Sequence, residues 1–302
     1  MTSQATSAPS SSNAPPEPAI PAGADRPAPA TGSAPALPGR PTRSLLHRWI
    51  VRPPGVLPAL TFLTILIVWE AAVAVFSVPS FVLPAPSRIA TGYGSFTTER
   101  WFQHIWATLE VALIGYALAI AIALPLAIAL TRSEVVNKAL YPILVVIQST
   151  PVVAVAPIII VVLGSGVAPR VVITFLISFF PLVVSTATGL LATPRELIEL
   201  SKSLRAPVWR EVTQIRLPFA IPYIFAALKI SITLAVIGAV VAEFVAAERG
   251  LGFLIQFSTS MFRLPEAWAG LSILVLLSLI LFQSVSVVQR LFFPWSLPKK
   301  GQ

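Results

Sequence analysis

Long apolar stretches separated by short polar segments dominate the sequence from residue 56 onward. A helix of about 20 residues spans the ~30 Å hydrocarbon core of a bilayer. Six stretches reach this length, and they cover residues 56–78, 105–130, 139–163, 169–190, 218–246 and 270–292. The pattern predicts an all-α, polytopic membrane protein with six transmembrane helices. The third stretch contains Pro142, Pro151 and Pro157, so we expect that helix to face protein or a pathway, where freed carbonyl groups find partners.

Residues 1–44 have a different composition, rich in Pro, Ala, Ser and Thr, and hold ten of the 29 prolines. Such a segment buries too little apolar area to offset its ordering entropy, so we expect a disordered tail. A solvated tether is the favoured interpretation, and a binding motif carried by the tail is the alternative. No apolar run follows a short basic start, so a signal peptide is not expected.

Composition supports a membrane protein and excludes several other classes. Hydrophobic residues make up 56% of the chain and charged residues only 11%, whereas a soluble domain carries about 25% charged residues. The absence of cysteine excludes disulfides, thiolate metal sites and cysteine nucleophiles. With only two histidines as well, we expect neither a metal nor a cofactor.

The distribution of Lys and Arg predicts the orientation in the membrane. If the N-terminus is inside, 14 of the 21 basic residues lie on the cytoplasmic side and five on the outer side. Cytoplasmic connections carry the excess of Lys and Arg. We therefore expect a multi-pass membrane protein with both termini in the cytoplasm. This placement accounts for the net charge of +9 without a nucleic-acid partner.

The segment 193–218, between the fourth and fifth stretches, has the pattern of an amphipathic helix. Pro207 interrupts it, which predicts two short helices with a bend near Arg205–Ala206. Thr193 and Glu196 have the spacing of a capping box for the first helix. The apolar positions that recur every three to four residues are Leu197, Leu200, Leu204, Val208, Val212 and Ile215.

An apolar stripe outside the membrane requires a cover. The pattern alone leaves two alternatives open. The stripe lies on the bilayer surface or on the chain's own helix ends, or it docks on a cytoplasmic partner protein.

This segment resembles the loop that marks permease subunits of ATP-binding-cassette (ABC) importers. In that family a Glu-Ala-Ala triplet is followed by a glycine and then by Ile-x-Leu-Pro. Glu199 takes the glutamate position, and the end of the motif is completed in register by Ile215, Leu217 and Pro218. Leu200 and Ser201 replace the alanines, and Arg205 replaces the glycine, so the bend is expected to rely on Pro207 instead.

Further matches resemble the nitrate, sulfonate and taurine type of permease and together cover about residues 55–293. They are Trp69-Glu70, Leu83–Ser87, Thr108-Leu109 with Gly115, Gln148–Pro151, Phe179–Pro181, Pro222, and Glu243 followed by Gly250–Gly252.

The resemblance implies the type I ABC importer permease fold and a division of the chain into parts. Residues 45–104 would form the first transmembrane helix and an outer loop, and residues 105–293 the permease domain. Residues 193–218 would be its coupling loop, and residues 294–302 a cytoplasmic C-terminus. It also implies a location in the bacterial inner (plasma) membrane. Three protein partners are implied as well: cytoplasmic ATPase subunits, an extracytoplasmic solute-binding protein and a second permease copy, which would make a homodimer. The residues implied to contact the ATPase are Glu196, Glu199, Leu200, Ser201, Leu204, Arg205, Ala206 and Pro207.

This division of labour agrees with the chain's lack of a nucleotide site of its own. None of its 15 glycines precedes a lysine, so the Gly-Lys core of a P-loop is absent.

Charged groups inside the predicted helices require an explanation, because they are costly in lipid. Lys229 and Glu243 share one face of the fifth helix. We expect Lys229 to extend its amine to the cytoplasmic interface. Glu243 has two interpretations, a structural ion pair or a part of a gate. Glu70 is expected to pair with a basic residue or reach the interface, and His104 to be an ordinary interfacial residue.

The candidate pathway residues are Gln148, Ser149, Thr150, Thr233 and Glu243. For Gln148, Ser149 and Thr150, hydrogen bonding to local carbonyl groups is the alternative. A second face of the fifth helix carries only small residues, which predicts a buried, central helix. These residues are Ser231, Ala235, Gly238, Ala242 and Ala246. We therefore expect the translocation route between the fifth helices of two subunits, with the third helix beside it.

The favoured function is a non-enzymatic permease subunit of an ATP-driven importer for a small solute of the nitrate, sulfonate or taurine class, or a related organic solute. The first alternative is a self-sufficient secondary transporter that uses Glu70, Glu110 or Glu243 as a proton site. The second is an intramembrane enzyme. The sequence has no Ser-His pair, HExxH motif or paired aspartates within a predicted span to support it.

Overall fold

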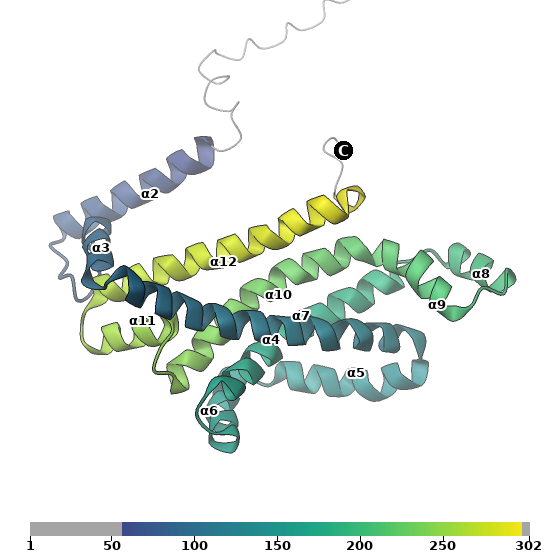
Figure 1. Cartoon of the computed structure of the whole chain (residues 1–302). Coiled ribbons are helices and arrows are strands. Elements are labelled where there is room, and N and C mark those ends of the chain that lie inside the picture. The colour runs from purple at the N-terminus through teal and green to yellow at the C-terminus, as the bar shows by residue number, and fades with distance from the viewer. Residues whose placement is uncertain (1–55, 298–302) are drawn as a thin grey trace, which may run out of the picture. The chain divides into compact units, whose positions relative to one another are not determined.

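The computed structural model describes residues 56–297, and all regular structure in this range is helical (Figure 1). The predicted tail, residues 1–44, lies outside the described range. The main helices are α2 (Val56–Val75), α3 (Pro86–Gly92), α4 (Thr98–Arg132), α5 (Glu134–Ser149), α6 (Val152–Leu163), α7 (Val167–Leu191), α8 (Arg195–Ser203), α9 (Val208–Arg210), α10 (Leu217–Ala246), α11 (Leu251–Ser260) and α12 (Leu264–Phe292).

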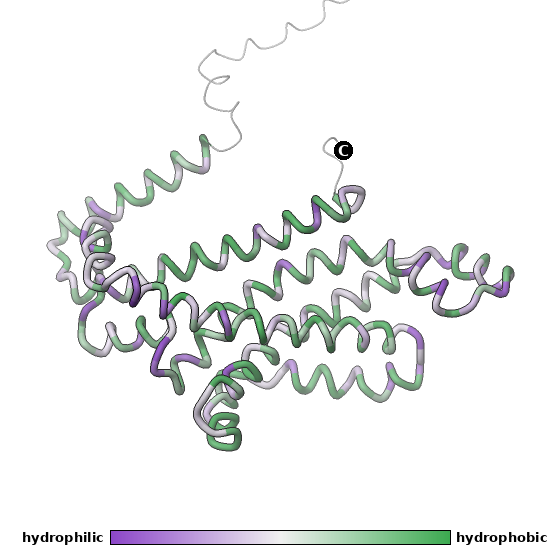
Figure 2. Tube along the Cα trace, viewed as in Figure 1, coloured by the Kyte–Doolittle hydropathy of each residue, from purple (hydrophilic) through white to green (hydrophobic). Residues whose placement is uncertain are grey.

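Within the described range, α2, α4, α7, α10 and α12 are each long and apolar enough to cross a membrane. Hydrophobic residues run along their length, and hydrophilic residues gather at the connections and around α8 and α9 (Figure 2). The predicted third helix is not one straight helix. It is the pair α5 and α6, bent by 95°, which gives a sixth span only if the pair crosses as a unit.

The bend between α5 and α6 has a local cause at Pro151. Proline has no N–H to donate and disfavours a helical conformation in the preceding residue. Thr150 accordingly leaves the helix with φ −77° and ψ 123°, and Pro151 starts α6 as its N-cap residue. Pro142 and Pro157 lie inside α5 and α6 and leave those helices continuous.

Helix α7 packs between α4 and α10, and the three helices form the buried centre of the described structure. Both neighbours approach α7 at Thr174. A Cβ atom on Gly115 of α4 would lie 2.7 Å from Cβ of Thr174, and one on Gly238 of α10 would lie 2.9 Å from its Cα. Only glycine permits contacts this close. The central position predicted for the fifth helix from its small residues is confirmed, since Ser231, Ala235, Gly238 and Ala242 are buried.

Helix α2 is joined to the outer connection through Glu70. Its carboxyl group accepts hydrogen bonds from the backbone N–H (3.0 Å) and the hydroxyl group (2.7 Å) of Ser87, in the first turn of α3. One residue earlier, the ring of Trp69 packs against Trp268 of α12 with centroids 5.0 Å apart. The expected basic partner is wrong for the residues that the structure describes, because α3 presents an uncapped helix N-terminus to Glu70; that Glu70 reaches the interface stays a prediction.

Candidate functional site

The amphipathic segment after α7 forms a helical elbow. Helix α8 begins at Arg195, with Pro194 rather than a side chain at its N-cap position. The predicted capping box is wrong, because the hydroxyl group of Thr193 donates to the carbonyl oxygen of Leu190 at 3.1 Å. The preceding helix therefore uses the side chain that was expected to cap α8.

The bend expected at Arg205–Ala206 is confirmed and has the geometry of a Schellman motif. The N–H of Ala206 donates to the carbonyl of Ser201 (3.0 Å), and that of Arg205 to the carbonyl of Lys202 (2.9 Å). Arg205 has φ 50°, the left-handed conformation usually left to glycine. It occupies the position where the resembling loops have glycine, so the turn persists although its usual residue is missing.

The elbow exposes large apolar side chains. We call the set Leu200, Leu204, Val208 and Trp209, whose exposed fractions are 55%, 72%, 49% and 60%, the elbow patch. Glu196 and Glu199 are exposed on α8 beside it, whereas Ser201 is buried. Contiguous exposed apolar surface of this kind, rimmed by polar residues, is typical of an interaction site.

Beyond Pro207 the elbow continues into the membrane without a break. Residues Val208–Ala246 form one helical stretch of 39 residues, about 58 Å long at 1.5 Å per residue. The predicted second short helix is therefore the first part of the fifth span. Ile215, Leu217 and Pro218 lie in this stretch, at a π-helical section (Glu211–Arg216) and the first turn of α10. The elbow beyond Pro207 and the central helix α10 are therefore parts of one continuous helical stretch.

Glu243, near the other end of this stretch, holds the connection from α10 to α11. It is 1% exposed, and its Oε2 atom accepts hydrogen bonds from the N–H of Gly252 (2.7 Å) and the hydroxyl group of Thr108 on α4 (3.1 Å). The same hydroxyl oxygen accepts from the N–H of Leu251 (2.8 Å). The N–H of Gly250 donates to Nδ1 of His104 (3.1 Å). His104 therefore has a structural contact and is not an ordinary interfacial residue.

The two glycines of this connection are required by the closeness of Glu243. A Cβ atom on Gly252 would lie 2.9 Å from Oε2 of Glu243, and one on Gly250 would overlap the carboxyl group. Gly250 also has φ 135°, which favours glycine. Glu243 forms no ion pair with any residue in 56–297, so the geometry supports a structural role through hydrogen bonds.

Lys229 has a partner within the protein. Its Nζ atom donates to Oε1 of Gln289 on α12 at 2.6 Å, and Nε2 of Gln289 donates to the hydroxyl group of Ser296 at 3.0 Å. This acceptor, on α12, is one that the sequence did not indicate; that the amine extends to the cytoplasmic interface stays a prediction.

The structure does not bring the candidate pathway residues together. Gln148, Ser149 and Thr150 are exposed at the bend between α5 and α6. Ser149 and Thr150 donate to the carbonyl groups of Val145 (2.8 Å) and Val146 (3.1 Å). On α10, Thr233 donates to the carbonyl of Lys229 at 3.3 Å, and Glu243 is enclosed as described above.

Comparison with known proteins identifies the family. Residues 117–296 match the family described as "Binding-protein-dependent transport system inner membrane component". The chain belongs to this family.

Full-length relatives support the assignment. The riboflavin transport system permease protein RibX of Chloroflexus aurantiacus is 36% identical over 78% of this chain and 88% of the relative. The formylaminopyrimidine transport permease protein ThiX of Halalkalibacterium halodurans is 33% identical over 79% of this chain and 95% of the relative. The taurine transport system permease protein TauC of Escherichia coli is 25% identical over 84% and 94%.

The fold comparison agrees with the family. A chain of the MetNI methionine ABC transporter in an inward-facing conformation superimposes with a TM-score of 0.56 and 21% identity, covering 64% of this chain and 96% of that chain. The chain therefore has the type I ABC importer permease fold and is a multi-pass inner membrane permease subunit. Such permease subunits are not themselves enzymes, and none of the matches supports the secondary-transporter alternative.

Proposed function

We propose that this permease forms the translocation pathway of an ATP-driven importer and works by alternating access. Its solute is a small molecule of the nitrate, sulfonate or taurine class, or a related organic solute. Relatives named for riboflavin, formylaminopyrimidine and taurine support this range of solutes. An extracytoplasmic solute-binding protein delivers the solute, and cytoplasmic ATPase subunits supply the energy.

The single observation that carries the proposal is the elbow patch on a rigid support. Its four large side chains are exposed, and the Schellman turn fixes α8 to a 39-residue helix that reaches Glu243. In the proposal, α8 sits in a groove of the ATPase, with Glu199 at its rim. Closure of the ATPase then moves α8, and α10 transmits the movement across the membrane.

A charge reversal tests the docking step. We expect Glu199→Lys to abolish co-purification of the permease with its ATPase while membrane insertion stays intact. The matched control is Glu134→Lys, which reverses an exposed charge at the start of α5, where Glu134 pairs with Lys138 at 2.8 Å. In Figure 1 the connection from α4 to α5 lies at the same end of the helices as α8 and α9. Undiminished co-purification of Glu199→Lys, or an equal loss in the control, would refute the docking role.

A second test addresses the energy source. Solute uptake by the assembled importer is expected to stop when the ATPase subunit carries a substitution that prevents hydrolysis. Uptake that persists at the normal rate would favour a secondary transporter instead.

The orientation and the second copy complete the proposal. Both termini lie in the cytoplasm, as the excess of basic residues in the connections predicts. Two copies form a homodimer, and the route runs between their α10 helices with the α5–α6 pair beside it. Among residues 229–246, Ile230 and Ile237 are exposed on α10, at 54% and 49%, whereas Ala235 is fully buried.

Cysteine accessibility tests the route, and the chain has no cysteine of its own. We expect Ile230→Cys and Ile237→Cys to react with aqueous thiol reagents in at least one state of the transport cycle. Ala235→Cys, on the buried face, is the control and should stay protected. Protection of every position from 229 to 246 in every state would exclude this route.

A further inference from the structure

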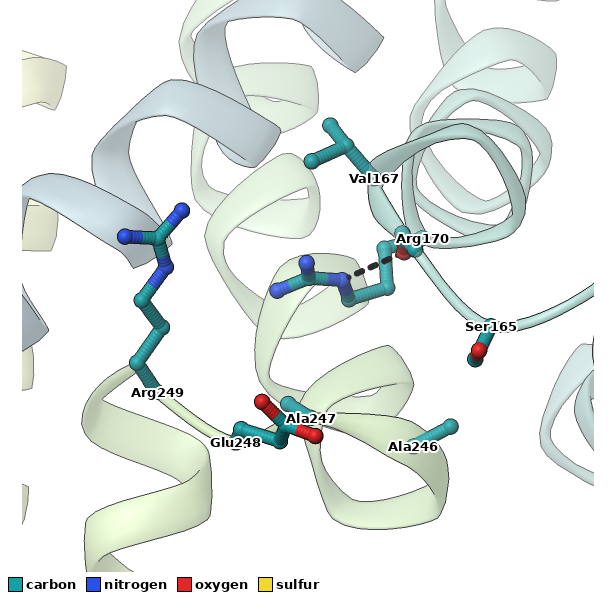
Figure 3. A pocket seen from close by; sticks show the side chains of 8 residues that line it. Ser165, Val167, Arg170, Ala246, Ala247, Glu248 and Arg249 are labelled. Atoms are coloured by element: carbon teal, nitrogen blue, oxygen red, sulfur yellow. Dashed lines mark hydrogen bonds between the residues drawn. The ribbon is translucent and has the colours of Figure 1, made fainter.

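A pocket of about 680 Å³ opens between the start of α7 and the end of α10. Arg170, Glu248 and Arg249 contribute its charged side chains (Figure 3). The lining residues come from two connections, 165–167 before α7 and 246–249 after α10. The pocket therefore lies at the end of α10 opposite the elbow. Its volume is in the range of sites that enclose small molecules, about 300–1,000 Å³.

Arg170 is the unusual group in this pocket. It is only 8% exposed, and its Nε atom donates to the carbonyl of Gly166 at 2.8 Å. This bond holds the side chain against its own helix, and the two Nη groups extend toward the gap between α7 and the residue 246–249 connection (Figure 3). Neither Nη group has a hydrogen-bond or ion-pair partner in residues 56–297. The side chain is buried while its Nη groups face the pocket without a direct partner among these residues, and an anion there would pair with them by charge-assisted hydrogen bonds.

The surroundings favour an anion as that partner. Helix α7 has 25 residues, and its N-cap residue, Gly166, provides no side-chain cap. The N-terminus of α7, with the positive end of its dipole, therefore borders the pocket without a side-chain cap. Arg249 adds a second positive charge, whereas Glu248 is the one acidic residue among those that line the pocket.

We propose that the Arg170 pocket binds a compact anionic group, a carboxylate or a sulfonate, at the outer end of the permease. This inference rests on the proposed importer function, which places the pocket where the solute enters. The two Nη groups donate to two oxygen atoms of the anion, the bidentate geometry for which guanidinium is suited. The anionic group belongs either to the solute or to an acidic side chain of the solute-binding protein.

The competing explanation is that Arg170 only offsets the charge of Glu243. The two groups interact electrostatically but form no ion pair with each other. If this were its whole role, a cysteine placed at the pocket would not be protected by an added anion.

The test uses a single cysteine at the pocket, Ser165→Cys, in the full-length permease in phosphatidylcholine nanodiscs. We compare the rates at which it reacts with an anionic methanethiosulfonate (sulfonatoethyl) and a cationic one (trimethylammonioethyl). The ratio of anionic to cationic rate is expected to fall roughly tenfold on adding Arg170→Gln, because one nearby positive charge is lost. Arg170→Lys, which keeps the charge, should retain most of the ratio. Ser260→Cys, at an exposed position at the end of α11, is the control and should not respond.

Protection experiments then separate the two sources of the anion. Protection of Ser165→Cys by methanesulfonate or acetate alone, lost in Arg170→Gln, assigns the pocket to the anionic group of a solute. Protection only by the binding protein, also lost in Arg170→Gln, assigns it to an acidic side chain of that protein.

Two results would overturn the anion site. One is a rate ratio that does not depend on Arg170. The other is an absence of Arg170-dependent protection of Ser165→Cys by methanesulfonate, by acetate and by the binding protein. Neither result depends on transport, so the anion site can fail while ATP-driven uptake stands, and uptake can fail while the site stands.

Discussion

Replacing Glu243 by alanine removes the acceptor that holds the connection between α10 and α11. The N–H of Gly252, now 2.7 Å from Oε2, would stay buried without a partner, which costs about 1–3 kcal/mol. The hydroxyl group of Thr108 can still donate to the carbonyl oxygen of His104 at 3.3 Å. Its loss of hydrogen-bond energy is therefore smaller than that of the Gly252 N–H. The substitution also leaves a small cavity. We therefore expect the free energy of local opening of the connection to fall by roughly 3 kcal/mol, which raises the population of the open form about 100-fold.

Trypsin reports this opening directly, because Arg249 is exposed within the same connection. Cleavage after Arg249 follows the population of the open form when closing is fast. We expect Glu243→Ala to raise its rate about 100-fold. Glu243→Gln keeps an acceptor oxygen for Gly252 and should stay within about tenfold of the wild type.

Cleavage after Arg263, at the N-cap of α12, is the internal control and should be unchanged. If Glu243→Ala left cleavage after Arg249 unchanged relative to Arg263, the carboxyl group would not be what holds this connection. The structural role assigned to Glu243 would then be refuted.

Substitutions at three further positions, 205, 238 and 229, have expected outcomes. Arg205→Gly should keep ATPase co-purification and raise the thermal midpoint slightly, since it relieves about 1 kcal/mol of left-handed strain, whereas Arg205→Val should weaken co-purification. Gly238→Leu should lower the thermal midpoint strongly by forcing α10 away from Thr174, and a midpoint unchanged from the wild type would contradict that contact. Lys229→Met should be destabilising by about 1–3 kcal/mol, because it leaves Gln289 without its donor. Adding Gln289→Leu should recover part of this loss, and additive losses in the double variant would contradict the pairing.

The sequence predicted the features that depend on local pattern. Hydrophobic runs of sufficient length predicted the membrane helices. A periodicity of three to four residues and the proline at 207 predicted the elbow and its bend. Each of these signals lies within a short segment of sequence. The structures that they predict also depend on interactions between residues within that segment.

Features that depend on which neighbour is present were missed. The prolines of the third stretch were visible, and Pro151 breaks the helix locally, but the position of a proline does not set the 95° angle between α5 and α6. Lys229 and His104 have partners 60 and 146 residues away, and no local pattern indicates them. The glycines at 250 and 252 were noted as a motif. Their closeness to Glu243, nine residues before Gly252, was the available signal for a glutamate enclosed by backbone.

The most direct test of the central claim uses thiol labelling of Leu204→Cys in the elbow patch, where the wild-type side chain is 72% exposed. A membrane-impermeant maleimide is applied to inside-out and right-side-out vesicles, with and without the ATPase subunit. The account predicts labelling only in inside-out vesicles and loss of that labelling when the ATPase binds. Labelling only in right-side-out vesicles, or labelling that the bound ATPase leaves unchanged, would contradict it.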